Sequence, residues 1–166
     1  MFKNRVTTGL VEKYLDRLGW QQHEARPELG EQEGVVITGW QGPGGGTGLL
    51  IDPIKEKNLL RFLAVDILKA PPSSTPSAHL NGLLMAMGFL NRQLILGKWS
   101  YDPSDGEVRF DLGVATDDDD LSFEEFGHCL KGVVIAVDGY AGDLRSIAEG
   151  KLSAGEFLER NGSKMG

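Results

Sequence analysis

The stretch that decides the fold is residues 80–115, which divides into LNGLLMAMGFLNR (80–92), QLILGKWSY (93–101), DPSDG (102–106) and EVRFDLGVA (107–115). The first piece has the apolar spacing of a helix, and the second is predicted to be a strand over residues 94–101. In the last piece, apolar residues alternate with polar or small ones: Val108, Phe110, Leu112 and Val114. Such alternation is typical of an antiparallel sheet with one buried and one wet face. Proline and glycine in residues 102–106 predict the turn between the two strands.

The helix predicted for residues 80–90 is apolar over a wide surface. One face carries Leu80, Leu83, Leu84, Met87 and Leu90, and further apolar side chains cover much of the rest. A sheet covers only one side of a helix, so the other side needs a second helix or a partner subunit. We therefore expect these five residues to lie at or near the interface of a homodimer.

The remaining elements complete a mixed fold. Apolar spacing predicts a helix over residues 7–19 and a large helix that begins at a capping box formed by Ser122 and Glu125. Further strands are predicted at residues 35–40, 49–51 and 59–68, with a weaker one at 20–24; residues 59–68 also fit a short helix. A short helix is predicted at residues 153–160.

The expected fold class is α+β: an antiparallel sheet with helices packed on one face, in the order α-β-β-β-α-β-β-α. Residues 1–160 are predicted to form a single domain, and residues 161–166 a frayed C-terminal tail.

Charge and hydropathy exclude several classes of protein. The formal net charge is −7, and lysine and arginine are scattered rather than clustered. Nucleic-acid binding and docking on anionic membranes both need a basic face, so neither is expected. Residues 1–13 have no long apolar run typical of a signal peptide, and no segment approaches the about 20 apolar residues of a membrane span. We expect a cytoplasmic location.

Three parts of this pattern together resemble a known family. They are the LNGLLMAMGFLNR helix (80–92), the GKWSYDPSDGEVRF hairpin (97–110) and the helix that begins LSFEEFGHCL (121–130). The chain resembles the YbjN family, whose members adopt the fold of type III secretion chaperones. This resemblance implies a cytosolic homodimer with a binding or regulatory role. True chaperones of this fold hold partly unfolded client segments along apolar grooves.

Segments that suggest chemistry have simpler explanations. Residues 42–48 (GPGGGTG) lack the lysine of a phosphate-binding loop and precede a strand, so a strand connection is expected. The acidic run Asp117 to Asp120 lacks the ligand spacing of a calcium loop and suits the start of a helix; the sequence leaves open whether it binds a cation. Cys129 is predicted to be a buried thiol, and the sequence leaves its reactivity open.

The three histidines are far apart in the sequence and have no metal-ligand spacing with the cysteine. We therefore predict no cofactor, no metal and no catalytic residue. The predicted function is a non-enzymatic, homodimeric protein-binding or regulatory module. The alternative is a small-ligand binder or enzyme with a site assembled from histidine and acidic residues.

Aromatic side chains on the predicted strands are the remaining candidates for a binding surface. Trp40, Trp99 and Tyr101 are candidate client contacts, because aromatic residues are enriched where binding energy concentrates. The alternative is that they belong to the core of the sheet.

Overall fold

The computed structural model describes residues 5–30, 33–74, 77–116 and 120–162. Its helices are α1 (Thr8–Arg17), α2 (Ala78–Gln93), α3 (Phe123–Ala148) and α4 (Ala154–Gly162), with a 3₁₀ turn η1 (Lys55–Lys57). Its strands are β1 (Glu24–Arg26), β2 (Val35–Gly42), β3 (Gly45–Ile54), β4 (Leu59–Lys69), β5 (Lys98–Tyr101) and β6 (Glu107–Ala115). The fold is α+β, as the sequence predicts.

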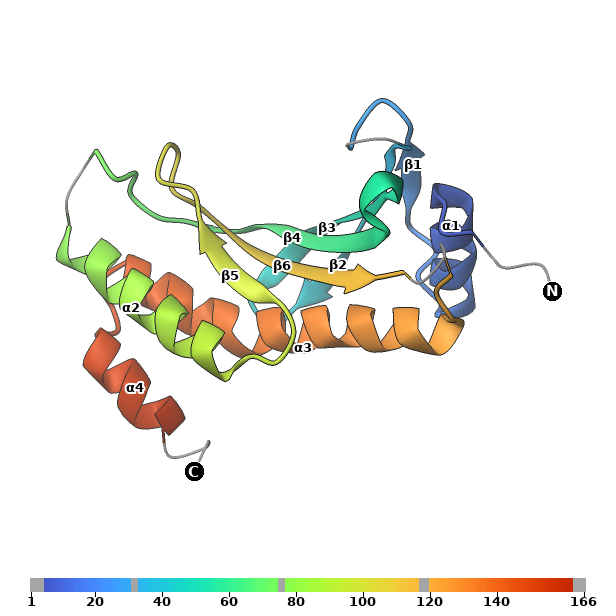
Figure 1. Ribbon diagram of the computed structural model, residues 1–166. Helices are drawn as coiled ribbons and strands as arrows, with labels where there is room; N and C mark the ends of the chain where they lie inside the picture. The colour runs from blue at the N-terminus through green and yellow to red at the C-terminus, as the bar shows by residue number, and fades with distance from the viewer. Residues whose placement is uncertain (1–4, 31–32, 75–76, 117–119, 163–166) are drawn as a thin grey trace.

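The six strands form one antiparallel sheet in the order β1-β2-β3-β4-β6-β5. In Figure 1 the helices lie below the sheet: α3 runs under its middle, α1 lies at the β1 end, and α2 and α4 lie at the β5 end. Apart from the short η1, the upper face of the sheet carries no helix among the described residues. The prediction that helices pack on one face is therefore confirmed.

Register determines which side chains enter the core. Phe62 pairs with Leu112, Ala64 pairs with Phe110, and all four side chains are buried on the helix side of the sheet. Phe62 meets Phe126 of α3, with the ring centroids 5.4 Å apart. The residues that alternate with these along each strand point to the open face. There, Arg61 Nη2 of β4 donates to Asp111 Oδ2 of β6 at 2.6 Å. The alternation of apolar residues read from β6 thus separates the core from the open face.

Local signals fix the turn between β5 and β6. Asp102 Oδ1 accepts from the backbone N–H of Ser104 at 2.9 Å, and Gly106 has φ +82°. A Cβ at Gly106 would lie 1.7 Å from the carbonyl oxygen of Ala70, so only glycine fits there. The predicted turn is confirmed for these residues.

Helix α3 begins as predicted. Ser122 Oγ accepts from the backbone N–H of Glu125, and the Glu125 carboxylate accepts from the N–H of Ser122, which completes the capping box. The helix then continues for 26 residues. It spans most of the sheet's width and carries much of the core packing.

Several boundaries differ from the sequence-based expectation. β3 continues through Pro53, which pairs with Leu60 of β4. The β2 register begins at Ile51, so Pro53 has a neighbouring strand on one side only and its missing N–H breaks no ladder. β5 starts at Lys98 rather than residue 94, and β1 is residues 24–26 rather than 20–24. The structure therefore has four strands before α2, one of them only three residues long.

The C-terminal segment is more ordered than a frayed tail over its first two residues. Asn161 and Gly162 belong to α4, and the side chain of Asn161 is buried and donates to the carbonyl oxygen of Phe157 at 2.8 Å. This side chain stays in the core because its amide is paired within the helix. The remaining residues, 163–166, lie outside the described residues.

Candidate functional site

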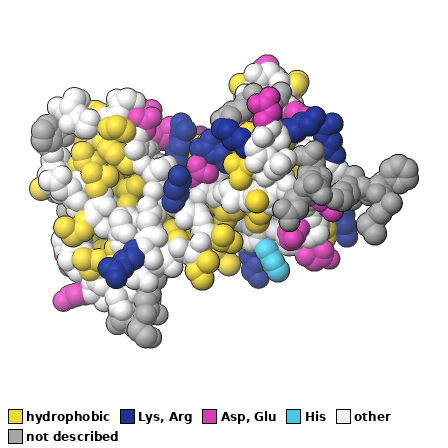
Figure 2. Space-filling view, in the orientation of Figure 1, with side chains coloured by type: hydrophobic (Ala, Val, Ile, Leu, Met, Phe, Trp, Pro, Cys, Tyr) yellow, Lys and Arg dark blue, Asp and Glu magenta, His cyan; other side chains and the backbone are white. Residues whose placement is uncertain are grey.

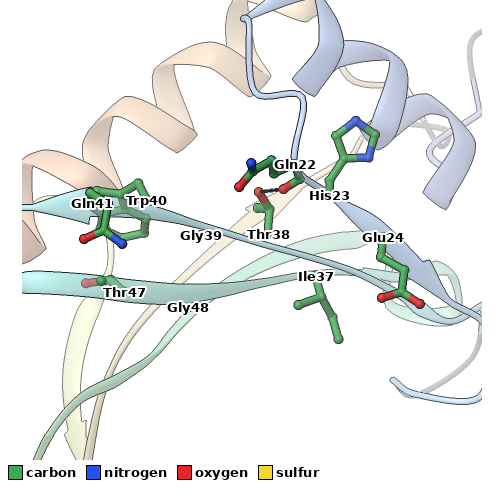
Figure 3. A pocket seen from close by; sticks show the side chains of 11 residues that line it. Gln22, His23, Glu24, Ile37, Thr38, Gly39, Trp40, Gln41, Thr47 and Gly48 are labelled. Atoms are coloured by element: carbon green, nitrogen blue, oxygen red, sulfur yellow. Dashed lines mark hydrogen bonds between the residues drawn. The ribbon is translucent and has the colours of Figure 1, made fainter.

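A hollow in the described surface lies along the β1–β2 edge of the sheet. It has a volume of about 740 Å³ and is lined by residues 22–24, residues 37–41 of β2 and residues 46–48 of β3. Figure 3 shows these three segments converging, with Gln22 and His23 on one side and the paired strands on the other. The hollow is therefore built from strand edges with three glycines and from the larger side chains around them, rather than from a deep cluster of polar groups.

The hollow exists because β1 is shorter than the strand it pairs with. β1 pairs with β2 only from Val35 to Ile37, whereas β2 continues to Gly42. Beyond Ile37 the chain that precedes β1 diverges, and Thr38 Oγ1 donates to the Gln22 carbonyl oxygen at 2.8 Å. In the part of the chain that the structure describes, residues 38–42 have no paired strand on this side. They form an open strand edge.

Glycines form the floor of the hollow on the open face of the sheet. Gly39 of β2 pairs directly with Gly48 of β3, and Gln41 pairs with Gly46. In Figure 3 the strand surface between Ile37 and Gln41 is bare at Gly39 and Gly48. A Cβ at Gly39 would lie 2.6 Å from the carbonyl oxygen of Thr47, so this position requires glycine. A ligand can therefore approach the backbone here.

Trp40 forms the rim of the hollow on the helix side. Its side chain is half-buried, and its Nε1 donates to Asp138 Oδ1 of α3 at 2.9 Å. The ring also packs against Trp20, with the centroids 6.2 Å apart. These contacts fix the orientation of the indole, so one part of the ring faces the hollow as a rigid apolar surface. Of the predicted client contacts, Trp40 is the one that lines this site.

His23 anchors the opposite wall. Its Nδ1 lies 3.0 Å from Glu12 Oε2 and its Nε2 lies 2.7 Å from Asp16 Oδ1, both on α1. A neutral imidazole has one donor nitrogen, whereas an imidazolium donates from both. Both nitrogens face carboxylates, so the arrangement fits the protonated ring. The hydrogen bond to Asp16 is the main cause that raises the pKa of His23; burial opposes it, and the bond to Glu12 adds to it.

The other edge of the sheet is closed by a side chain. On β5, the Trp99 backbone N–H donates to Asn91 Oδ1 at 2.7 Å, and the Trp99 carbonyl oxygen accepts from Asn91 Nδ2 at 2.9 Å. The amide of this α2 residue thus supplies one donor and one acceptor, as a neighbouring strand would. The two edges differ in that β5 is sealed at its centre and β2 is not.

The other two predicted client contacts lie elsewhere. Trp99 is 2% exposed and its ring packs edge-on against Phe110, with the centroids 5.3 Å apart. It belongs to the core, as the alternative interpretation held. Tyr101 is half-buried and its hydroxyl donates to the carbonyl oxygen of Pro71 at 2.6 Å. Neither residue lines the hollow.

The five residues predicted for a dimer interface divide into two groups. Leu80, Leu83, Met87 and Leu90 are buried within the single chain. The second cover that the wide apolar surface of α2 needs comes largely from α3 and α4. Leu84 reaches the surface, 39% exposed, beside Met85 at 59%. Homodimerisation through α2 stays a prediction. Of the five predicted residues, Leu84 is exposed and available for such an interface, and it lies beside the exposed Met85.

Hydrophobic side chains also reach the surface beyond α2. Figure 2 shows them gathered at the α2 end of the molecule and along its lower edge, where the loop between α2 and β5 turns. Ile95 and Leu96 of that loop are 97% and 62% exposed. Exposed apolar groups of this size favour contact with another molecule.

Where the structure describes them, the segments weighed for chemistry have structural roles. Gly42 pairs with Gly45 across a tight turn between β2 and β3, so the glycine-rich segment is a strand connection. Cys129 is buried, and burial raises the pKa of its thiol, which lowers its reactivity. Among the described residues, no three histidine, cysteine, aspartate or glutamate side chains are placed to hold a metal ion. Asp120 is described, whereas residues 117–119 of the acidic run are not.

Sequence reasoning found Trp40 but not the hollow that it borders. The hollow depends on where β1 stops pairing, which involves residues far apart in the chain. The helices that the structure describes include none with both the length and the apolar character of a membrane span.

Comparison with known proteins identifies the relatives of this chain. The model of the YbjN family, described as a putative bacterial sensory transduction regulator, matches residues 7–145. No curated protein matches the chain. The crystal structure of YbjN, a putative transcription regulator from E. coli, is similar with a TM-score of 0.54 and 14% identity, covering 99% of this chain and 98% of that one.

The crystal structure of the ExsC–ExsE complex is also similar, with a TM-score of 0.54 and 16% identity, covering 85% of this chain and 97% of that one. At these identities the two structures establish a shared fold, and the family match extends over most of the sequence. The resemblance read from the helix, hairpin and second helix is confirmed: the chain belongs to the YbjN family.

Proposed function

We propose that this protein is a non-enzymatic regulator that works as a homodimer and binds an extended segment of a client protein along the open edge of β2. The observation that carries the proposal is the stretch of residues 38–42, which pairs with β3 on one side, has no described strand on the other, and lies beside a hollow of about 740 Å³. The family description as a regulator and the fold shared with a chaperone in complex support a protein-binding role. The same relationship favours a cytoplasmic location.

The physical basis of binding is strand addition. An extended peptide that lies beside residues 38–42 exchanges backbone hydrogen bonds with the free groups of β2, and side-chain contacts determine which peptide fits. Trp40 supplies a rigid apolar surface at the rim, already oriented by Asp138 and Trp20. Pre-oriented aromatic side chains contribute strongly to binding because little rotamer entropy is lost.

The alternative, an enzyme or small-ligand binder with a histidine and acidic site, has one candidate cluster in His23, Glu12 and Asp16. Both ring nitrogens of His23 are engaged by the carboxylates, and its side chain is 9% exposed. A general base needs a free nitrogen within hydrogen-bond reach of a substrate. The cluster therefore fits a structural clamp better than a catalytic site.

The binding proposal is tested by selecting 12-residue peptides from a random display library on the full-length protein and mapping the bound peptide by amide chemical shifts. We expect the largest shifts at residues 38–42 and a loss of binding of about 10-fold or more for Trp40→Ala, as for a central aromatic contact. Trp40→Phe is the matched control, because it keeps an aromatic ring at the rim while it removes the bond to Asp138. Shifts confined to another surface, with unchanged binding by Trp40→Ala, would contradict the proposal.

The homodimer is tested by sedimentation at micromolar concentration. Leu84→Glu places a charge on the exposed side of α2 and is expected to weaken association without unfolding the chain, whereas Met87→Glu buries a charge and is expected to unfold it. Wild-type protein that sediments only as a monomer would refute the homodimer.

A further inference from the structure

We propose that the client segment carries an aromatic residue whose ring covers the Gly39–Gly48 pair, with a lysine or arginine within two residues of it. This inference rests on the proposed strand addition at β2 and specifies its partner. The features that carry it are the bare glycine floor and the negative charge that borders it.

The floor has the shape that a ring fills. Gly39 and Gly48 face each other across β2 and β3, and Gly46 lies two residues further along on the same face. Ile37 stands at one end of this strip and the long side chain of Gln41 at the other, as Figure 3 shows. An aromatic side chain from a neighbouring strand reaches across an adjacent glycine and covers the backbone that the glycine leaves exposed. A smaller side chain would leave the backbone of these glycines exposed to water.

Charge around the floor favours a cationic partner. Glu24 lines the hollow at the end of β1, and no lysine or arginine is among the residues that line it. The ring of His23 lies between the carboxylates of Glu12 and Asp16, so this wall is net negative even when the ring is protonated. On the other side, Asp66 Oδ2 lies 3.5 Å from the position of a Cβ on Gly48. A cation beside the aromatic residue would therefore meet carboxylates at either end of the floor.

The position of Asp66 follows from an irregularity in β4. The register of β4 with β6 shifts between Ala64 and Leu68, and Asp66 has φ +59°, a left-handed conformation that is uncommon for aspartate. The bulge turns this carboxylate toward Gly48. Unusual backbone of this kind is retained where the surrounding structure requires it.

The test uses peptides selected from the random 12-residue display library against the full-length protein at low salt. We expect the selected peptides to share an aromatic residue with lysine or arginine within two positions. Replacing that aromatic residue by alanine should weaken binding by about 10-fold or more. Replacing the cation should weaken it less, and the difference should shrink as salt is raised.

A protein variant then locates the ring. Gly48→Ala adds a methyl group to the floor. Its Cβ would lie 3.1 Å from Val65 Cγ2 and 3.5 Å from Asp66 Oδ2, so the Val65 side chain must shift by a few tenths of an ångström, and folding should be retained. It should weaken the aromatic peptide severalfold and leave the alanine-substituted peptide unchanged, which is the signature of direct coupling. Gly139→Ala is the matched control, since its Cβ would meet nothing within 4 Å and the residue does not line the hollow.

The outcomes separate the two proposals. If no peptide is selected, or if selected peptides ignore Trp40→Ala, strand addition at this edge is refuted and the present inference with it. If peptides bind in a Trp40-dependent manner but lack the aromatic residue, or bind Gly48→Ala and wild type equally, the glycine-floor inference alone is overturned. The peptide substitution gives this answer even if Gly48→Ala fails to fold.

Discussion

The two edges of the sheet differ in how their outward-facing backbone N–H and C=O groups are covered. At β5 the Asn91 amide pairs with the N–H and C=O of Trp99, and the Trp99 ring lies in the core. At β2 the pairing strand stops at Ile37, and Trp40 stands at the rim of a hollow. Exposed edges invite unwanted pairing, and proteins usually cover them. This chain covers its β5 edge and leaves the β2 edge open. The β2 edge is therefore a candidate surface for binding a partner.

The largest expected effect separates the two tryptophans. Trp99→Ala removes a fully buried ring and should lower the free energy of unfolding by about 3–5 kcal/mol. Trp40→Ala removes a half-buried ring and should cost clearly less stability while weakening peptide binding by about 10-fold or more. Urea unfolding of both variants makes the comparison. Equal losses of stability in the two variants would mean that Trp40 supports the fold as much as Trp99 does, and would contradict the difference between the two edges.

The second prediction concerns the seal at β5. Asn91→Ala leaves the Trp99 N–H and C=O without their side-chain partner and should lower stability by about 2 kcal/mol. It should also speed amide exchange at Trp99. The control is Asn81→Ala on the same helix, an exposed position where little change is expected. If the two variants behave alike, Asn91 does not protect the edge.

The smallest expected effect concerns the wall of the hollow. The pKa of His23 is raised, so the folded state holds the proton on this ring more tightly than the unfolded state does. Its contribution should be fully present below the unfolded value of about 6.5 and be lost as pH rises through the folded pKa. Because Asp16 is 62% exposed, solvent screening limits the contribution to about 1 kcal/mol.

Unfolding of wild type and His23→Gln measures this contribution. The advantage of the wild type should be largest below about pH 6.5 and should shrink as the pH rises through the folded pKa of His23. A stability difference that does not change with pH would show that the clamp does not depend on the proton.

The sequence predicted those parts of the fold that local chemistry determines. The turn at residues 102–106 and the capping box of Ser122 and Glu125 each depend on a few adjacent residues, and both are confirmed. The end of β3 was placed too early because proline normally interrupts a strand. Pro53 is tolerated only because β2 does not extend alongside it, which is a tertiary fact.

The candidate site was predictable only in one residue. Trp40 was recognised by its type, and Trp99, a residue of the same type on another predicted strand, proved to be core. No local signal marks where β1 stops, and glycines 39, 46 and 48 indicate flexibility rather than a floor. The hollow arises from the pairing of three segments, so it needed the structure.

The Asn91 seal also limits how the chain can change length. The Asn91 amide can pair with the backbone groups of one strand residue. This is enough for β5, which has only four residues, whereas β6 has nine. A longer β5 would extend past the reach of that side chain and expose a second unpaired edge. Insertions should therefore be accommodated between Ile95 and Leu96, the exposed part of the loop before β5, and not in the strand itself.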